Sequence, residues 1–131
     1  MIFIDSSAFL AIVKVDDINH LRAKRQWKNL LEANEPLYTN NYVIVESIAI
    51  LQKRSGLNIL KNLQSNILGL VIIDWIGKEH YSQALESVFE LNRRKLSLVD
   101  CTAFQTMRRL GIETVFTFDS HFREEGFKVI P

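Results

Sequence analysis

Cysteine, proline and glycine are all scarce in this sequence. Its 131 residues include one cysteine, two prolines and five glycines. The single Cys101 excludes an internal disulfide and a cysteine-rich zinc site, and it fits a reducing compartment. The chain contains no linker, no low-complexity tract and no internal repeat, so we expect one domain over residues 1–131.

A long hydrophobic run and an excess of one charge are also missing. The longest apolar run, Ile67 to Ile73, has seven residues, whereas a membrane span requires about 18. The N-terminus lacks the basic start and apolar stretch of a signal peptide, so we expect a cytoplasmic protein that does not enter a membrane. Sixteen Lys and Arg against fifteen Asp and Glu give a formal net charge of +1, so binding to nucleic acid would depend on local basic patches.

The composition that remains is ordinary for a globular domain, with 47% hydrophobic and 24% charged residues. Short apolar runs alternate with longer amphipathic stretches, which predicts an α/β fold with a mainly parallel five-stranded sheet covered by helices on both faces. The expected strands are 2–4, 37–39, 70–73, 114–117 and 127–130. The expected helices are 8–14, one between Asp16-Asp17 and Asn34, 42–54, 57–68, 78–95, 98–110 and 120–125.

Several residues predict where these helices begin and end. Ser6 and Ser7 are expected to cap the first helix, and Ser97 is expected to cap the helix that follows it. Gly56 and Gly111 suit helix C-termini. In the second helix we expect an apolar stripe to face the core: Ile18, Leu21, Trp27, Leu30 and Leu31.

Four carboxylates stand where the pattern predicts burial. Asp5 and Asp119 follow predicted strands, whereas Glu46 and Asp100 enter from predicted helices. Removing an ionised carboxylate from water costs several kcal/mol unless it is paired or bound to a cation. A divalent cation at the carboxyl edge of the sheet would compensate several of them at once. Oxygen-only ligation favours Mg²⁺ or Mn²⁺ over zinc, and these ions suit chemistry on a phosphate ester.

Each acid also has a plain structural interpretation. Asp5 could be a loop or cap residue, Asp119 could cap the helix after it, and Asp100 could lie on the exposed side of its helix. Glu46, surrounded by Val and Ile, could be held by an Arg or Lys partner. Asp74 also ends a strand, and we interpret it as a cap and not as a ligand.

Hydroxyl, imidazole and basic side chains near these acids carry weaker signals. Ser6 and Thr117 could hydrogen-bond a metal-bound water or an acidic ligand, with a helix cap and a strand position as the alternatives. His121 is interpreted as a lone surface histidine and not as a phosphate contact, and Cys101 as a buried core thiol. Most basic clusters are expected on solvated helix faces, although any could contact a nucleic-acid backbone: Arg22/Lys24/Arg25/Lys28, Lys53/Arg54, Arg93/Arg94/Lys95 and Arg108/Arg109.

The sequence resembles the PIN-domain ribonucleases, and within them the compact toxins of VapBC toxin–antitoxin modules. Four segments carry the resemblance, in order and over essentially the whole chain: IFIDSSAF from Ile2, TNNYVIVE from Thr39, LSLVDC from Leu96 and TFDSHF from Thr117. Competing motifs are missing, since there is no phosphate-binding GxxxxGK[ST], no GxGxxG, no GxSxG and no HExxH.

The resemblance implies a three-layer α/β/α sandwich whose acidic side chains converge on one or two Mg²⁺ or Mn²⁺ ions: Asp5, Glu46, Asp100 and Asp119. Ser6 matches the hydroxyl residue that follows the first acid, and Thr117 matches the one two positions before the last. Family members hydrolyse RNA phosphodiesters with metal-activated water. The toxins often form homodimers and are silenced by a small antitoxin protein.

Two functions are consistent with this resemblance. The first is a metal-dependent endoribonuclease that acts as the toxin of a toxin–antitoxin module. The second is an RNA-binding or scaffolding PIN module with little cleavage activity of its own. The complete acidic set favours the first.

Overall fold

A computed structural model describes all 131 residues, and it contains one five-stranded sheet in which every strand pair is parallel. The spatial order of the strands is β3-β2-β1-β4-β5. Their bounds are β1 Ile2–Ile4, β2 Leu37–Asn40, β3 Ile72–Asp74, β4 Thr114–Phe116 and β5 Lys128–Ile130. The expected α/β fold with a parallel sheet is confirmed.

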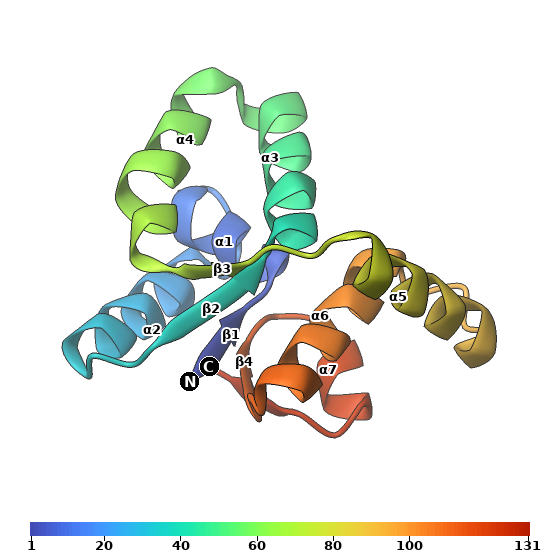
Figure 1. The fold of residues 1–131 in the computed structure, drawn as a ribbon. Helices are drawn as coiled ribbons and strands as arrows, with labels where there is room; N and C mark the ends of the chain where they lie inside the picture. The colour runs from blue at the N-terminus through green and yellow to red at the C-terminus, as the bar shows by residue number, and fades with distance from the viewer.

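Helices cover both faces of this sheet (Figure 1). The helices are α1 Ser6–Val13, α2 His20–Glu32, α3 Asn41–Ser55, α4 Leu57–Asn62, α5 Lys78–Leu91, α6 Leu98–Leu110 and α7 His121–Glu124. A π-helical turn, Leu63–Ile67, and a 3₁₀ turn, Leu68–Leu70, continue α4. Figure 1 shows α1 to α4 on one side and α5 to α7 on the other, as right-handed crossovers require.

The order of the strands reverses next to β1. From β1 the chain adds β2 and then β3 on one side, and it crosses over to place β4 and β5 on the other. Ile4 therefore lies beside Phe116 in the register of β1 and β4. In open parallel sheets, a crevice forms beyond the carboxyl ends of the two strands where the order reverses. The residues that follow β1 and β4 are thus at the favoured position for a binding site.

The hydrophobic core encloses the middle of the sheet. β1 is buried along its full length, and Phe3 and Phe116 are completely enclosed. Burying one such side chain contributes about 1.5–3 kcal/mol. β3 and β5 form the sheet edges, so they are more open, and Ile72 is 53% exposed. The core thus fixes β1 and β4 most firmly.

Several predicted helix ends are confirmed. Ser97 caps α6, and its hydroxyl accepts a hydrogen bond from the backbone N–H of Asp100. Gly56 and Gly111 end α3 and α6 with positive φ angles of 83° and 71°, which glycine adopts without steric cost. None of the helices is both long and apolar enough to cross a bilayer.

Other local predictions were wrong. Ser6 and Ser7 lie inside α1, which has Asp5 at its N-cap position and no side-chain cap hydrogen bond. α5 ends at Leu91 and not at residue 95, because Asn92 adopts a left-handed conformation with a φ of 48°. The predicted helix 57–68 is α only as far as Asn62.

The apolar stripe predicted for the second helix was also partly wrong. Trp27 and Leu30 are buried, but Ile18 and Leu21 are 96% and 76% exposed. Ile18 precedes the helix, which begins only at His20, so the stripe does not extend to it.

Candidate active site

Asp5 is the most deeply buried of the four acids. It follows β1 directly and is only 4% exposed. Its Oδ2 accepts hydrogen bonds from the hydroxyls of Thr117, at 2.8 Å, and Ser7, at 3.1 Å. Burial raises the pKa of Asp5 to about 6; the negative charge of Asp100 adds to this increase and the hydrogen bonds oppose it. Asp5 is therefore a buried carboxylate whose charge is only partly compensated by its hydrogen bonds.

The same two hydroxyls hold the loop that follows β4. Thr117 Oγ1 accepts a hydrogen bond from the backbone N–H of Asp119, and Ser7 Oγ accepts one from that of Phe118, at 3.0 and 2.9 Å. The hydroxyls lie 3.0 Å from each other. They therefore connect Asp5 to the segment that carries Asp119 and fix both acids at the carboxyl edge of the sheet. Sequence reasoning assigned Ser7 to a helix cap and missed this contact.

Glu46 is hydrogen-bonded to Ser6, the residue that follows Asp5. The Ser6 hydroxyl donates a 2.6 Å hydrogen bond to Glu46 Oε1, although the two residues are 40 positions apart. Glu46 forms no ion pair with Lys or Arg, so the alternative of a basic partner is wrong. α3 thus carries this carboxylate to the same side of the sheet as Asp5.

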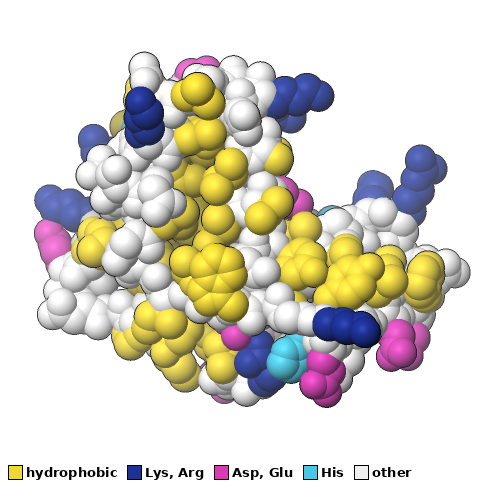
Figure 2. All heavy atoms as spheres, turned by 45° about the horizontal axis from the view of Figure 1, so that its top comes forward, with side chains coloured by type: hydrophobic (Ala, Val, Ile, Leu, Met, Phe, Trp, Pro, Cys, Tyr) yellow, Lys and Arg dark blue, Asp and Glu magenta, His cyan; other side chains and the backbone are white.

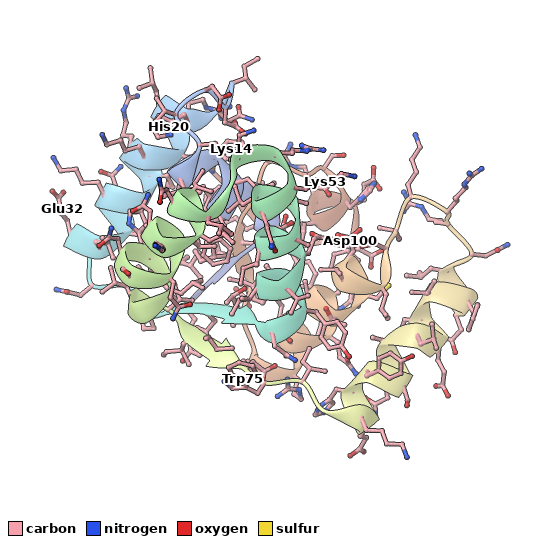
Figure 3. All side chains as sticks on the ribbon, turned by 90° about the horizontal axis from the view of Figure 1, so that it is seen from above. Lys14, His20, Glu32, Lys53, Trp75 and Asp100 are labelled. Carbon is pink, nitrogen blue, oxygen red and sulfur yellow. The ribbon has the colours of Figure 1, made fainter.

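Asp100 enters from the start of α6 beside α3 (Figure 3). Its Oδ2 accepts the backbone N–H of Ser97 at 3.0 Å, which completes a reciprocal capping box. The side chain is 15% exposed, so the alternative of an acid on the exposed side of the helix is wrong. Burial raises the pKa of Asp100, and the charge of Asp119 adds to this effect.

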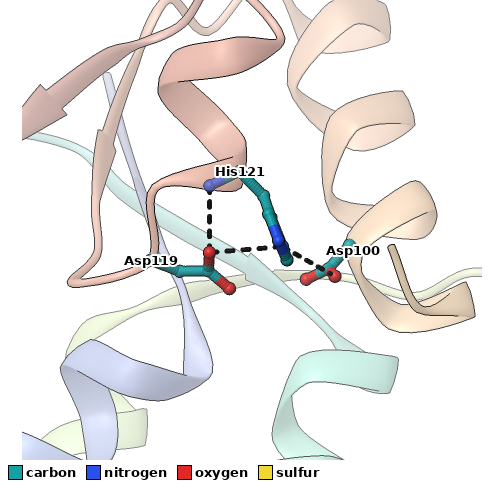
Figure 4. A group of neighbouring side chains, drawn as sticks. All are labelled: Asp100, Asp119 and His121. Atoms are coloured by element: carbon teal, nitrogen blue, oxygen red, sulfur yellow. Dashed lines mark hydrogen bonds and ion pairs between the residues drawn. The ribbon is translucent and has the colours of Figure 1, made fainter. Parts of the chain in front are cut away.

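His121 lies between Asp100 and Asp119 (Figure 4). Its Nδ1 is 3.3 Å from Asp119 Oδ1 and 3.7 Å from Asp100 Oδ2, and the side chain is only 18% exposed. Asp119 Oδ1 also accepts the backbone N–H of His121 at 2.9 Å. The interpretation of His121 as a surface residue is therefore wrong. Its separation of two from Asp119 is the signal that could have suggested a shared site.

These contacts bring the predicted residues to one edge of the sheet, but not equally closely. Asp100, Asp119 and His121 each offer a ligand atom, and these atoms lie within 4.8 Å of one another. Asp5 lies outside this trio and is tied to it by Thr117, while Glu46 is attached through Ser6. Convergence of all four acids on one cation stays a prediction.

The donor set fits a divalent cation. None of the four acids forms an ion pair with Lys or Arg, and burial, with a smaller contribution from neighbouring acids, raises the pKa of Asp5 and Asp100. His121 Nδ1 is buried and has no hydrogen-bond partner. Carboxylate oxygens are the ligands that Mg²⁺ and Mn²⁺ prefer, and an imidazole nitrogen is a common ligand of transition-metal ions.

Two residues outside the cluster were also interpreted from the sequence. Cys101 is buried, as expected of a core thiol, and burial raises its pKa. Asp74 does not cap a helix. It ends β3, where it accepts a 2.9 Å hydrogen bond from Thr106 and pairs with Arg109, so its charge is compensated.

Comparison with known proteins agrees with this geometry. Residues 2–128 match the PIN domain. The chain is 32% identical over 130 residues to the 23S rRNA-specific endonuclease VapC20 of Mycobacterium tuberculosis, covering 97% of this chain and 95% of the relative. The crystal structure of Mycobacterium tuberculosis VapC20, described as a sarcin-ricin loop cleaving toxin, superposes with a TM-score of 0.84 at 30% identity, over 97% of this chain and 96% of that one.

A more distant structure supports the fold alone. The crystal structure of FitAcB from Neisseria gonorrhoeae is 19% identical in sequence and superposes with a TM-score of 0.70. The match covers 100% of this chain and 97% of that one. The parallel sheet, the acids at its carboxyl edge and the match over residues 2–128 lead to one assignment. The chain belongs to the PIN-domain family.

Proposed function

We propose that the protein is a metal-dependent endoribonuclease that hydrolyses RNA phosphodiester bonds and acts as the toxin of a toxin–antitoxin module. The observation that carries this proposal is the group of carboxylates without Lys or Arg partners where the strand order reverses. The likeness to VapC20, a 23S rRNA-specific endonuclease, supports the same chemistry. Because this relative acts on 23S rRNA, that RNA is the first substrate to test.

The residues that would hold the cation are the four acids Asp5, Glu46, Asp100 and Asp119, with His121 as a fifth donor. When bound, Mg²⁺ or Mn²⁺ offsets charge on the phosphate and lowers the pKa of an attacking water. The compact trio of Asp100, Asp119 and His121 supplies the closest set of ligand atoms. Asp5 and Glu46 complete the negative surface from β1 and α3.

The hydroxyl residues would keep these ligands in place. Ser7 and Thr117 both donate to Oδ2 of Asp5, so one oxygen of this carboxylate is held by two hydroxyl groups. Ser6 fixes one oxygen of Glu46 in the same way. Because these hydrogen bonds are already formed, the carboxylates need little rearrangement when the substrate arrives.

The test is RNA cleavage by the purified protein with Mg²⁺, with Mn²⁺ and with EDTA. We expect cleavage only with a metal, and a loss of several orders of magnitude in Asp5→Asn and Asp100→Asn. Asp16→Asn is the matched control, because Asp16 is 85% exposed and pairs only with Lys14, which is outside the cluster. Cleavage that survives EDTA and both substitutions would refute the mechanism. RNA binding without cleavage would favour an RNA-binding or scaffolding module.

The proposal includes a small antitoxin partner, a homodimer and a cytoplasmic location. Figure 2 shows an extended area of hydrophobic side chains on one face. Exposed apolar residues available for protein contacts include Val45, Leu57, Trp75 and Phe89, which are 63–72% exposed. Growth arrest on expression, relieved by a cognate partner, would support the toxin assignment, and light scattering would measure the dimer. Normal growth with abundant active enzyme would contradict the toxin assignment and leave the nuclease intact.

A further inference from the structure

A small hollow with two arginines adjoins Asp119 on the side of β5. Its volume is about 210 Å³, and it is lined by Arg22, Arg123, Thr117, Phe118, Asp119 and Ser120 together with two residues of the C-terminal strand region, Val129 and Pro131. Arg22 comes from α2 and Arg123 from α7, so the two guanidinium groups reach the hollow from different layers. The hollow therefore places two positive charges directly beside the acidic cluster.

Neither arginine is neutralised within the protein. Arg93, Arg108 and Arg109 pair with Glu124, Glu125 and Asp74. By contrast, Arg22 and Arg123 form no ion pair, even though Asp119 lines the same hollow. Both side chains are exposed, so an anion can reach them from solvent.

Arg22 is held by a contact other than an ion pair. Its guanidinium carbon lies 5.6 Å from the centre of the Phe118 ring, within the range of a cation–π interaction. Phe118 is fixed in turn, because its backbone N–H donates to Ser7. The Ser7 hydroxyl, which donates to Asp5, thus also positions the Phe118 ring that Arg22 contacts. An arginine oriented in this way loses less freedom when it binds a phosphate.

We infer that Arg22 and Arg123 form a phosphate-binding subsite that holds the RNA backbone next to the phosphodiester being cleaved. This inference rests on the proposed function, since it assigns the substrate of the same site. Arginine binds phosphate oxygens through two parallel N–H donors. Asp119 belongs both to the trio that would hold the cation and to the lining of the hollow, so adjacent phosphates of one strand would occupy two sides of that residue.

The test is steady-state cleavage of a short single-stranded RNA by Arg22→Gln and Arg123→Gln. We expect each substitution to raise KM about tenfold while kcat changes little, because a charge-assisted hydrogen bond to substrate is lost. RNA binding should also be measured at several salt concentrations in proteins that carry Asp5→Asn to prevent cleavage. The slope of log K against log salt concentration should become shallower by about 0.7 for each phosphate contact that is lost. Arg25→Gln and Arg94→Gln are matched controls, because both arginines are exposed, unpaired and outside the hollow.

The outcomes separate the two proposals. A wild-type protein that binds RNA without cleaving it would contradict the proposed function, and the salt slopes would still test the subsite. Active enzyme whose KM and salt slope are the same in the hollow variants and the controls would overturn the subsite. So would a fall in kcat alone, which would show that the arginines act on folding or chemistry and not on binding. A neutral methylphosphonate beside the cleaved bond should abolish the difference between wild type and Arg22→Gln.

Discussion

Thr117 donates a 2.8 Å hydrogen bond to Asp5, which joins residues 112 positions apart in the sequence. The bond connects the ends of β1 and β4, the two neighbouring strands where the strand order reverses. Thr117 also accepts the backbone N–H of Asp119. One hydroxyl therefore sets the position of two acids of the candidate active site.

Removing this hydroxyl should weaken activity without removing any carboxylate. We expect Thr117→Val to lower kcat by about tenfold to a hundredfold, the cost typical of losing a hydrogen-bond partner of a metal ligand. The pKa of Asp5 should rise further, because the Thr117 hydrogen bond favours the ionised form. The acid limb of the pH–activity profile should shift upward accordingly.

Thr114→Val is the matched control for that experiment. Thr114 is also in the β4 region, but its side chain forms no hydrogen bond in the structure, so its loss should leave the pH profile unchanged. Equal profiles for Thr117→Val and wild type would contradict the role assigned to this hydroxyl.

The burial of Asp5 predicts how stability depends on pH in the metal-free protein. Its folded pKa of about 6 is above the ordinary value of 3.8, so folding favours the neutral acid. The contribution of Asp5 to stability should therefore be most favourable below about pH 4 and should be lost as the pH rises through 6. The full cost above pH 7 is about 3 kcal/mol.

Asp5→Asn should remove this dependence. The variant should match the wild type near pH 4 and exceed it by up to about 3 kcal/mol at pH 7.5 in EDTA, as measured by urea unfolding. Saturating Mn²⁺ should narrow the gap, because the cation stabilises only the ionised site. A variant less stable than the wild type at every pH would show that the Asp5 carboxylate is compensated by something else.

His121 should contribute a nitrogen to the bound cation. Its Nδ1 is buried without a hydrogen-bond partner between two carboxylates. We expect the electron paramagnetic resonance of bound Mn²⁺ to show a nitrogen coupling that disappears in His121→Asn, with affinity for Mn²⁺ reduced about tenfold or more. His80→Asn, on α5, is the control. A spectrum without nitrogen coupling in the wild type would restrict the ligands to oxygen.

The central fold could be predicted from sequence because its signals are local. The run at Ile2–Ile4 is a strand in the middle of the sheet, and its apolar character follows from burial on both faces. Ser97, Gly56 and Gly111 marked helix ends through their own chemistry. The end of α5 at Leu91 was not predictable in this way, since it depends on Asn92 adopting a left-handed conformation.

Only part of the candidate active site could be predicted from the sequence. Apolar surroundings singled out Asp5 and Glu46, but the partners of these acids come from distant segments. Ser7 has ordinary capping chemistry in the sequence, and only the approach of β4 to β1 turns its hydroxyl toward Asp5 and Phe118. His121 was misread for the same reason, because Asp100 reaches it from another helix.

Asp74 provides the sharpest contrast with Asp5. Both acids stand at the carboxyl end of a parallel strand, but Asp74 is held by Arg109 and Thr106 at the sheet edge. Asp74→Asn should therefore destabilise the protein by about 1 kcal/mol and leave RNA cleavage within about twofold of wild type. Asp5→Asn should instead stabilise the metal-free protein at neutral pH and abolish RNA cleavage. Unfolding midpoints and cleavage rates measured side by side would check this, and a large loss of activity in Asp74→Asn would mean that the active site extends to β3.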